Sequence, residues 1–278
     1  MAELLPVFDM HIHSTRSDGL RSPMELAQMA RRSGLAGWAL TDHDILPDPE
    51  VLDYLAGQTG LTIIPGVEIS TYQGDRLLHL LGYGFDVDTG SLADLCQSLL
   101  QQRRERMEQM VASIQEKIPR FDLREIQQLR HHASAGRKHL ARELVRQKWV
   151  SSTRGAFEKY LTPMSKELPS IGVPLAEAVK AIHSAGGVAV LAHPPTGMSI
   201  DDWRLLATVG LDGLETRFGR VAHSHRRFLE ARSTEYGWVC SAGSDYHGDG
   251  GRNQLGTHTV TREQLDAILA RRQAIGCA

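Results

Sequence analysis

The segment FDMHIHSTRSDG places two histidines, His11 and His13, one residue apart and follows them with Asp18. The apolar residues before them predict a short strand, and in a strand residues i and i+2 point to the same face. Two neutral imidazoles that leave a strand together suit a divalent metal ion. The pattern is short, so for this pair alone a solvated strand end is an equal alternative.

Further candidate metal ligands lie at the ends of other predicted strands. They are His43 after GWALT, Glu68 in IPGVEIS, His79 in LLHLLGY, His193 in VLAHPP, and Asp245 and His247 in CSAGSDYHG. In an α/β barrel the carboxyl ends of the strands gather at one face, so residues far apart in sequence can converge there. Nine nitrogen and oxygen donors exceed the need of one tetrahedral ion. They predict a site for two or three ions that share a bridging carboxylate.

Short apolar runs alternate with amphipathic helices in the first and last thirds of the chain. The segment SPMELAQMARRSG, for example, has Ser22 and Glu25 spaced as a capping box at the start of a helix. This alternation predicts a mostly parallel α/β fold over residues 1–86 and 173–278. Between residues 87 and 172 the pattern predicts helices alone. We therefore expect an α/β barrel that carries an all-helical insertion.

The predicted insertion is the basic part of the chain. It begins with a long predicted helix over residues 91–117, and it contains 15 Lys and Arg against 10 Asp and Glu. The remainder contains 16 Lys and Arg against 23 Asp and Glu. A basic helical cap over an acidic body suits an anionic substrate held between them. For the charge alone, a solvated helix face is the simpler alternative.

The composition is that of an ordinary globular protein of 278 residues, 41% hydrophobic and 23% charged, with a formal net charge of -2. No apolar run is long enough to span a bilayer, and the first ten residues lack the pattern of a signal peptide. Cys96, Cys240 and Cys277 are widely spaced, which is typical of reduced thiols. We therefore expect a cytoplasmic protein without a membrane partner.

Six motifs together resemble the PHP (polymerase and histidinol phosphatase) family of phosphoesterases. In chain order they are DMHIHSTRSDG, LTDHD, GVEIS, HLLGY, LAHP and GSDYH. The resemblance covers roughly residues 7–86 and 173–260. The helical segment with GRKHLARELV is also similar to the insertion of one branch of that family. That branch contains 3',5'-nucleotide bisphosphate phosphatases and exoribonucleases of the RNase AM (TrpH-like) type.

The resemblance implies a distorted (β/α)7 barrel that holds three divalent ions, often manganese. One ion would be held by His11, His13, Glu68 and Asp245, a second by Glu68, His79 and His193, and a third by Asp18, His43 and His247. Asp42 and Asp44 of the TDHD motif would orient His43 or shape its loop rather than bind metal. Nitrogen and oxygen ligands fit manganese, iron or zinc, so the metal itself is open.

Other residues are candidates for contact with the substrate. Arg137 in GRKH matches a motif position of the nucleotide-phosphatase branch, and a guanidinium binds phosphate in bidentate fashion. His139 lies on the same segment. His223 and His225 follow the strand DGLET and would contact phosphate or protonate the leaving alkoxide. Asp245, besides binding metal, could take a proton from the attacking water.

The sequence thus predicts a metal-dependent phosphoesterase in which the ions supply hydroxide at neutral pH. The expected substrate is a small nucleotide of the 3',5'-bisphosphate type, extending to the 5' ends of short RNA. A cyclic phosphate of ribose and a monoester such as histidinol phosphate stay open, because RFGRVAHSHRR and PTGMS depart from the family pattern. A non-catalytic PHP module fits less well, because the ligand set is complete. Oligomeric state is not indicated.

Overall fold

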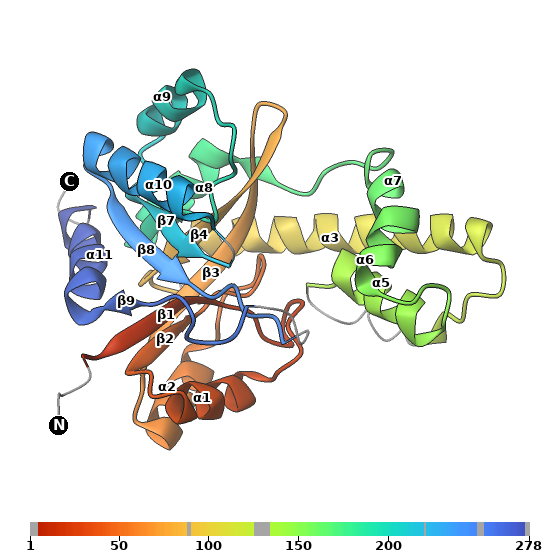
Figure 1. Ribbon diagram of the computed structural model, residues 1–278, viewed down its shortest axis with the longest axis horizontal. Coiled ribbons are helices and arrows are strands. Elements are labelled where there is room, and N and C mark those ends of the chain that lie inside the picture. The colour runs from red at the N-terminus through yellow and green to blue at the C-terminus, as the bar shows by residue number, and fades with distance from the viewer. Residues whose placement is uncertain (1–4, 88–89, 125–133, 220, 249–252, 276–278) are drawn as a thin grey trace.

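The computed structural model describes residues 5–87, 90–124, 134–219, 221–248 and 253–275 (Figure 1). Its strands are β1 (Val7–Ile12), β2 (Gly37–Leu40), β3 (Thr62–Gln73), β4 (Arg76–Tyr83), β5 (Val173–Pro174), β6 (Val188–Leu191), β7 (Gly213–Phe218), β8 (Val239–Gly243) and β9 (Val260–Thr261). Its helices on the barrel are α1 (Pro23–Arg32), α2 (Pro49–Thr59), α8 (Leu175–Ser184), α9 (Ile200–Thr208), α10 (His223–Tyr236) and α11 (Arg262–Ile275). The helices between β4 and β5 are α3 (Gly90–Lys117), α5 (Arg137–Arg146), α6 (Thr153–Ala156), the π-helical turn η1 (Phe157–Leu161) and α7 (Thr162–Ser165).

The strands form one mixed sheet in the order β8-β7-β6-β4-β3-β2-β1-β9, with β5 beside β3. Strands β1 to β3 are parallel, and so are β6 to β8, but β4 runs antiparallel to both β3 and β6. The sheet is thus mostly parallel, as expected, and the antiparallel direction of β4 is a feature that the sequence did not predict. Only Gly74 and Asp75 separate β3 from β4, and Gly74 has a φ of 58°. A two-residue turn of this kind joins antiparallel neighbours, whereas parallel neighbours need a long crossover.

Strand β8 at one end of the sheet approaches β1 near the other end, which gives the predicted distorted barrel. Beyond the end of β1, the backbone N–H of His13 donates to the carbonyl of Tyr246 at 3.0 Å, and Ile12 pairs with Tyr246 in a parallel bridge. Gly243 at the end of β8 lies so close to β1 that a Cβ there would be 2.2 Å from Cβ of His11. The carboxyl ends of β1 and β8 thus lie side by side, with ligand candidates on both.

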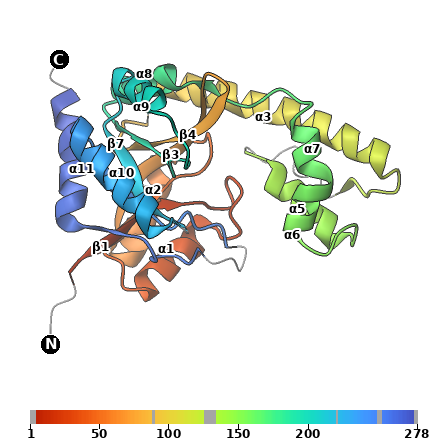
Figure 2. The same cartoon turned by 45° about the horizontal axis from the view of Figure 1, so that its top comes forward.

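A helical insertion extends from one side of the barrel, as predicted (Figures 1 and 2). The first part of α3 packs Leu92, Leu95 and Leu99 into the barrel core beside α8. Its second part carries Met107 and Ile114 into a separate core shared with α5, η1 and α7. One continuous helix therefore joins the insertion to the barrel, and it begins one residue before the predicted range 91–117.

The helices that the structure describes include none that is long and apolar enough to cross a membrane. Helix α3 has 28 residues, which is sufficient length for a bilayer. It contains Arg103, Arg104 and Arg106 within one turn, and charges at the centre of a membrane span are costly. Its length serves instead to carry the insertion out from the barrel.

The close approach at Gly243 gives a prediction for stability. The Gly243→Ala variant is expected to lower the free energy of unfolding by about 2 kcal/mol or more, because its methyl group must displace the His11 backbone. A Gly57→Ala control on α2, where a Cβ meets nothing within 4 Å, is expected to raise it by up to about 1 kcal/mol. Urea unfolding measures both. Equal stability of Gly243→Ala and the parent would contradict the contact between β8 and β1.

Candidate metal centre

A buried carboxylate, Glu68 on β3, lies at the centre of the carboxyl-end face of the barrel. Its side chain is 1% exposed. Five histidine rings surround it: His11, His13 and His43 at 3.4, 3.1 and 3.0 Å from Oε2, and His79 and His193 at 2.9 Å from Oε1. Both oxygens are therefore shared between several rings. This is the arrangement expected of a carboxylate that bridges ions.

The sheet explains why these side chains converge. Alternation on β1 gives His11 and His13 a common direction, with their Nε2 atoms 3.1 Å apart. The parallel pairing of β2 with β3 continues beyond β2, so that His43 lies beside Glu68. In the antiparallel pair, His79 of β4 lies opposite Ser70 of β3, two residues from Glu68 and on the same face. The β3–β4 hairpin, which the sequence did not predict, therefore places His79 beside Glu68.

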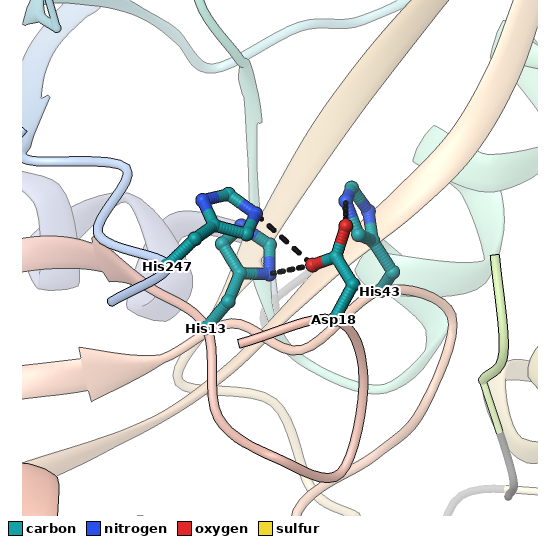
Figure 3. A group of neighbouring side chains, drawn as sticks. All are labelled: His13, Asp18, His43 and His247. Carbon is teal, nitrogen blue, oxygen red and sulfur yellow. Dashed lines mark ion pairs between the residues drawn. The ribbon is translucent and has the colours of Figure 1, made fainter. Parts of the chain in front are cut away.

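A second part of the site lies around Asp18, which is 8% exposed (Figure 3). Its Oδ1 is 3.0 Å from Nε2 of His247 and 4.0 Å from Nδ1 of His13. Its Oδ2 is 3.9 Å from Nε2 of His43. The His13 and His247 rings stack with centroids 4.1 Å apart. Three imidazoles and one carboxylate therefore face a common centre.

Four groups of side chains place their ligand atoms within 4.8 Å of one another. They are His13, Asp18, His43 and His247; His11, His13 and Asp245; His11, Glu68 and His193; and His43, Glu68 and His79. Across the described chain, these groups contain the nine predicted ligands and no other residue. The grouping differs from the expectation, because His13 also joins the Asp18 group and Glu68 is absent from the group of His11, His13 and Asp245. The expected group of Glu68, His79 and His193 is divided, with His43 beside His79 and His11 beside His193. Shared ligands of this kind suit adjacent ions.

The donor atoms themselves fit divalent metal ions. Buried polar atoms that lack a hydrogen-bond partner are concentrated here, and they include Asp18 Oδ1, His43 Nδ1, Glu68 Oε2, His79 Nδ1 and His247 Nε2. Burying such atoms without a partner is costly, whereas a metal ion would engage each of them. Imidazole nitrogen and carboxylate oxygen are ligands for manganese, iron and zinc.

Burial and neighbouring charges shift the pKa values of several ligand candidates. Burial disfavours the charge of Glu68, but the His43 and His79 rings hold its pKa well below the usual range. Burial likewise opposes a charged His13, but the nearby carboxylates of Asp245 and Glu68 raise its pKa to about 9. Burial lowers the pKa of His43 to about 3. Glu68 is thus ionised at neutral pH, and protons compete with metal at His13.

Two further carboxylates shape the ligand loops, as expected for the TDHD motif. Asp42 accepts hydrogen bonds from the backbone of Ser14 at 2.8 Å and from the hydroxyls of Ser14 and Ser17. It therefore fixes the turn between His13 and Asp18. Asp44 accepts from the backbone N–H and hydroxyl of Ser70 at 2.6 and 2.8 Å.

The helical insertion contacts this face directly. Arg103 on α3 lies 2.6 Å from Oδ2 of Asp44, and the Ser134 hydroxyl donates to the carbonyl of His43 at 2.7 Å. The ammonium of Lys138 lies 3.2 Å from Oδ2 of Asp18. Arg103 and Lys138 were not predicted as site residues. Lys138 follows the predicted Arg137 in GRKH, so the segment was identified but not this residue.

A cavity of about 280 Å³ lies between the barrel face and the insertion. Its lining on the barrel side includes Asp18, His43, Glu68, His79, His193, Asp245 and His247. On the insertion side it includes Arg103, Arg106, Arg137, Lys138, Met107, Met110 and Phe157. The cavity thus joins the ligand cluster to a cationic and partly apolar wall.

The remaining predicted substrate contacts fall in different places. Arg137 lines the cavity, but His139, His223 and His225 are not among the described residues that do. Nδ1 of His139 accepts from the backbone N–H of Gly136 at the start of α5. His223 is exposed as the first residue of α10, and His225 donates to the carbonyl of Pro194 at 2.9 Å. That these three histidines contact the substrate stays a prediction, because none of them is among the described residues that line the cavity.

Comparisons with known proteins agree with this geometry. The chain matches the PHP domain family over residues 9–165. It is 31% identical over 258 residues to a 5'-3' exoribonuclease of Haemophilus influenzae, covering 90% of this chain and 93% of that protein. It is 32% identical over 255 residues to the 3',5'-nucleoside bisphosphate phosphatase of Chromobacterium violaceum, covering 88% of this chain and 89% of that protein.

A solved structure extends the comparison to three dimensions. A protein of Bifidobacterium adolescentis, provisionally described as a metal-dependent phosphoesterase, matches with a TM-score of 0.87 and 27% identity. The match covers 95% of this chain and 96% of that one. The relatives share the cleavage of phosphate esters, but their names give different substrates.

The position of Glu68 gives a prediction for metal binding. Glu68→Gln keeps the size of the side chain but removes the negative charge that five rings surround, so it is expected to weaken manganese binding by more than about 100-fold. Elemental analysis after dialysis gives the metal content, and circular dichroism checks the fold. Parent-like metal content in a folded variant would exclude Glu68 as a ligand.

The raised pKa of His13 gives a prediction for pH. An imidazolium cannot bind metal, so binding at neutral pH must release its proton, and affinity should increase as pH rises toward about 9. Titration calorimetry with manganese in two buffers of different ionisation enthalpy measures this release. Identical binding enthalpies in the two buffers would show that His13 is already neutral and would contradict the prediction.

Proposed function

This chain belongs to the PHP domain family and is a metal-dependent phosphoester hydrolase, and on that basis we propose that it removes a phosphate from a small nucleotide with two separate phosphate groups. The 3',5'-bisphosphate type is the preferred substrate, and the 5' end of short RNA is a related one. The observation that carries the proposal is the cavity, with the ligand cluster at its barrel end and the arginines at its insertion end. The ligand cluster and the arginines would provide separate sites for two anionic groups.

Two arginines of the insertion form the second end of the cavity. Arg106 and Arg137 have no carboxylate partner within the part of the chain that the structure describes. Arg106 donates to the carbonyls of Leu168 and Ser165, and Arg137 donates to the Ser165 hydroxyl at 3.4 Å. Carbonyl and hydroxyl partners orient a guanidinium without neutralising it. Both therefore keep a full positive charge at the cavity.

The electrostatics at this end favour an anion. Burial and the charge of Arg137 lower the pKa of Arg106, and burial and the charge of Arg103 lower the pKa of Arg137. Neighbouring cations that repel one another are stabilised by a shared anion. Arginine binds phosphate in bidentate fashion, which makes a phosphate the best fit among common anions.

Apolar side chains also line the cavity. Met107, Met110 and Phe157 line the cavity, and Leu77, which is 54% exposed, lies on the barrel side. The guanidinium of Arg137 lies 6.0 Å from the centroid of the Phe157 ring. Apolar and aromatic surface of this kind suits the sugar and base of a nucleotide, whereas an inorganic anion would make no use of it.

The proposed roles of the chain's own residues follow from these positions. The nine clustered donors would hold two or three divalent ions, with manganese as the preferred metal. When bound, such ions lower the pKa of a water molecule and withdraw charge from the phosphate. The carboxylate of Asp245, whose side chain is 29% exposed, would accept the proton of the attacking water. The arginine end would meanwhile hold the second phosphate and fix the nucleotide.

A substrate panel tests the proposal. With manganese added, we expect the highest kcat/KM for adenosine 3',5'-bisphosphate, a lower value for short 5'-phosphorylated RNA, and the lowest values for a ribose cyclic phosphate and for histidinol phosphate. Released inorganic phosphate or new termini are measured. A preference for the cyclic ester or for histidinol phosphate would replace the proposed substrate class.

The arginine end has its own prediction. Arg137→Met is expected to lower kcat/KM for the bisphosphate by about 10-fold to 100-fold, corresponding to the loss of a charge-assisted hydrogen bond. The effect on p-nitrophenyl phosphate, which has one phosphate, should be small. Arg104→Met, an exposed position on α3, is the matched control and should leave both values unchanged. Equal losses on both substrates in Arg137→Met would contradict a separate second site.

A further inference from the structure

Glu215 on β7 is a fully buried carboxylate immediately behind the ligand cluster. It is 0% exposed, and its two oxygens have different partners. Oε1 accepts a hydrogen bond from ring nitrogen Nδ1 of His11 at 3.0 Å. Oε2 accepts from the backbone N–H of His193 at 2.7 Å. One side chain therefore joins two ligand candidates that lie 182 positions apart in the sequence, as the residue numbers show.

The contact with His11 determines which ring nitrogen faces the cluster. A carboxylate can only accept a hydrogen bond, so Nδ1 of His11 must carry the proton. The lone pair of a neutral ring then lies on Nε2, which is 3.1 Å from Nε2 of His13 and 3.4 Å from Oε2 of Glu68. With the other tautomer, Nε2 would carry a hydrogen and could not bind metal.

The contact with His193 fixes a strained piece of backbone. His193 has a φ of 28°, in the left-handed region that residues with a Cβ seldom adopt. A short hydrogen bond from its N–H to a buried carboxylate helps to hold this conformation. In this backbone conformation, Nε2 of His193 lies 2.9 Å from Oε1 of Glu68.

We propose that Glu215 is a positioning residue that fixes the tautomer of His11 and the backbone of His193, so that both rings present Nε2 to the same metal ion. The two histidines and Glu68 form one of the four ligand groups, which agrees with a shared ion. Glu215 belongs to none of these groups. The inference rests on the proposed metal ligands but not on the identity of the substrate.

The chain contains a matched control for this arrangement. Asp212, three residues before Glu215, also joins a histidine ring to a strand amide. Its Oδ2 is 2.8 Å from Nε2 of His183 and 2.8 Å from the backbone N–H of Ala189. Neither Asp212 nor His183 is among the described residues that line the cavity. An Asp212→Asn variant therefore shows how far the loss of a carboxylate between a histidine ring and a backbone N–H affects the protein when it lies away from the metal centre.

The decisive variant is Glu215→Gln. A carboxamide has one oxygen and one NH2 group, whereas both partners of Glu215 are donors. The backbone N–H of His193 cannot change, so the oxygen is expected to accept from it and the NH2 to face His11. The His11 ring then becomes an acceptor at Nδ1 and carries its proton on Nε2. Metal binding should weaken by about 10-fold to 100-fold.

The experiment combines two measurements on the intact protein. Nitrogen-15 NMR of histidine-labelled, zinc-loaded protein identifies the tautomer of His11, and competition with a chelator gives the dissociation constant for manganese. The parent and Asp212→Asn should both carry the His11 proton on Nδ1 and bind manganese equally. Glu215→Gln should bind manganese more weakly, and its His11 ring should no longer carry the proton on Nδ1.

Three results would overturn the proposal. They are a parent protein with the His11 proton on Nε2, a folded Glu215→Gln with parent-like manganese affinity, and an equal loss of affinity in Asp212→Asn. The first needs no variant, so the test stands even if Glu215→Gln does not fold. None of these readouts uses turnover. A failure of the nucleotide assay would therefore count against the proposed substrate and leave Glu215 unaffected.

Discussion

The structure depends on one buried charge, the carboxylate of Glu68, and on the five imidazole rings that surround it. A buried carboxylate is costly unless cations or strong hydrogen-bond donors compensate it. The rings come from β1, β4 and the segments after β2 and β6. The barrel must therefore close well enough for all of them to reach one point. Residues that position the rings are as necessary as the rings themselves.

The backbone shows the cost of this convergence. Asp44, His193 and Asp245 have φ values of 56°, 28° and 51°, and they account for three of the four described residues other than glycine with positive φ. All three lie in or beside the ligand cluster. Such conformations are unfavourable and persist where surrounding contacts hold them. Here those contacts are identifiable, because Ser70 and Arg103 bind Asp44, and Glu215 binds the backbone of His193.

The set of side chains that cluster could be predicted because it depends on local rules: alternation on β1, and the position of polar residues where apolar strands end. The direction of β4 was missed, because a two-residue turn at Gly74 overrides the general pattern of strand and helix. The importance of Arg103, Lys138 and Glu215 depends on which distant residue each one meets, and spacing carries no such information. The acidic residue within the short predicted strand DGLET, after Leu214, was the one available signal for Glu215. A position after a strand end is also not sufficient to place a residue in the site. His223 and His225 follow β7 in sequence, but they lie on α10, outside the described lining of the cavity.

The central claim is that Glu68 lies between metal ions in a multinuclear centre. The most direct test is anomalous diffraction, measured at the manganese absorption edge from crystals grown with manganese. The account predicts at least two anomalous peaks, with both Glu68 oxygens in contact with metal. A map without a peak beside Glu68, or with one peak confined to the Asp18 group, would contradict it.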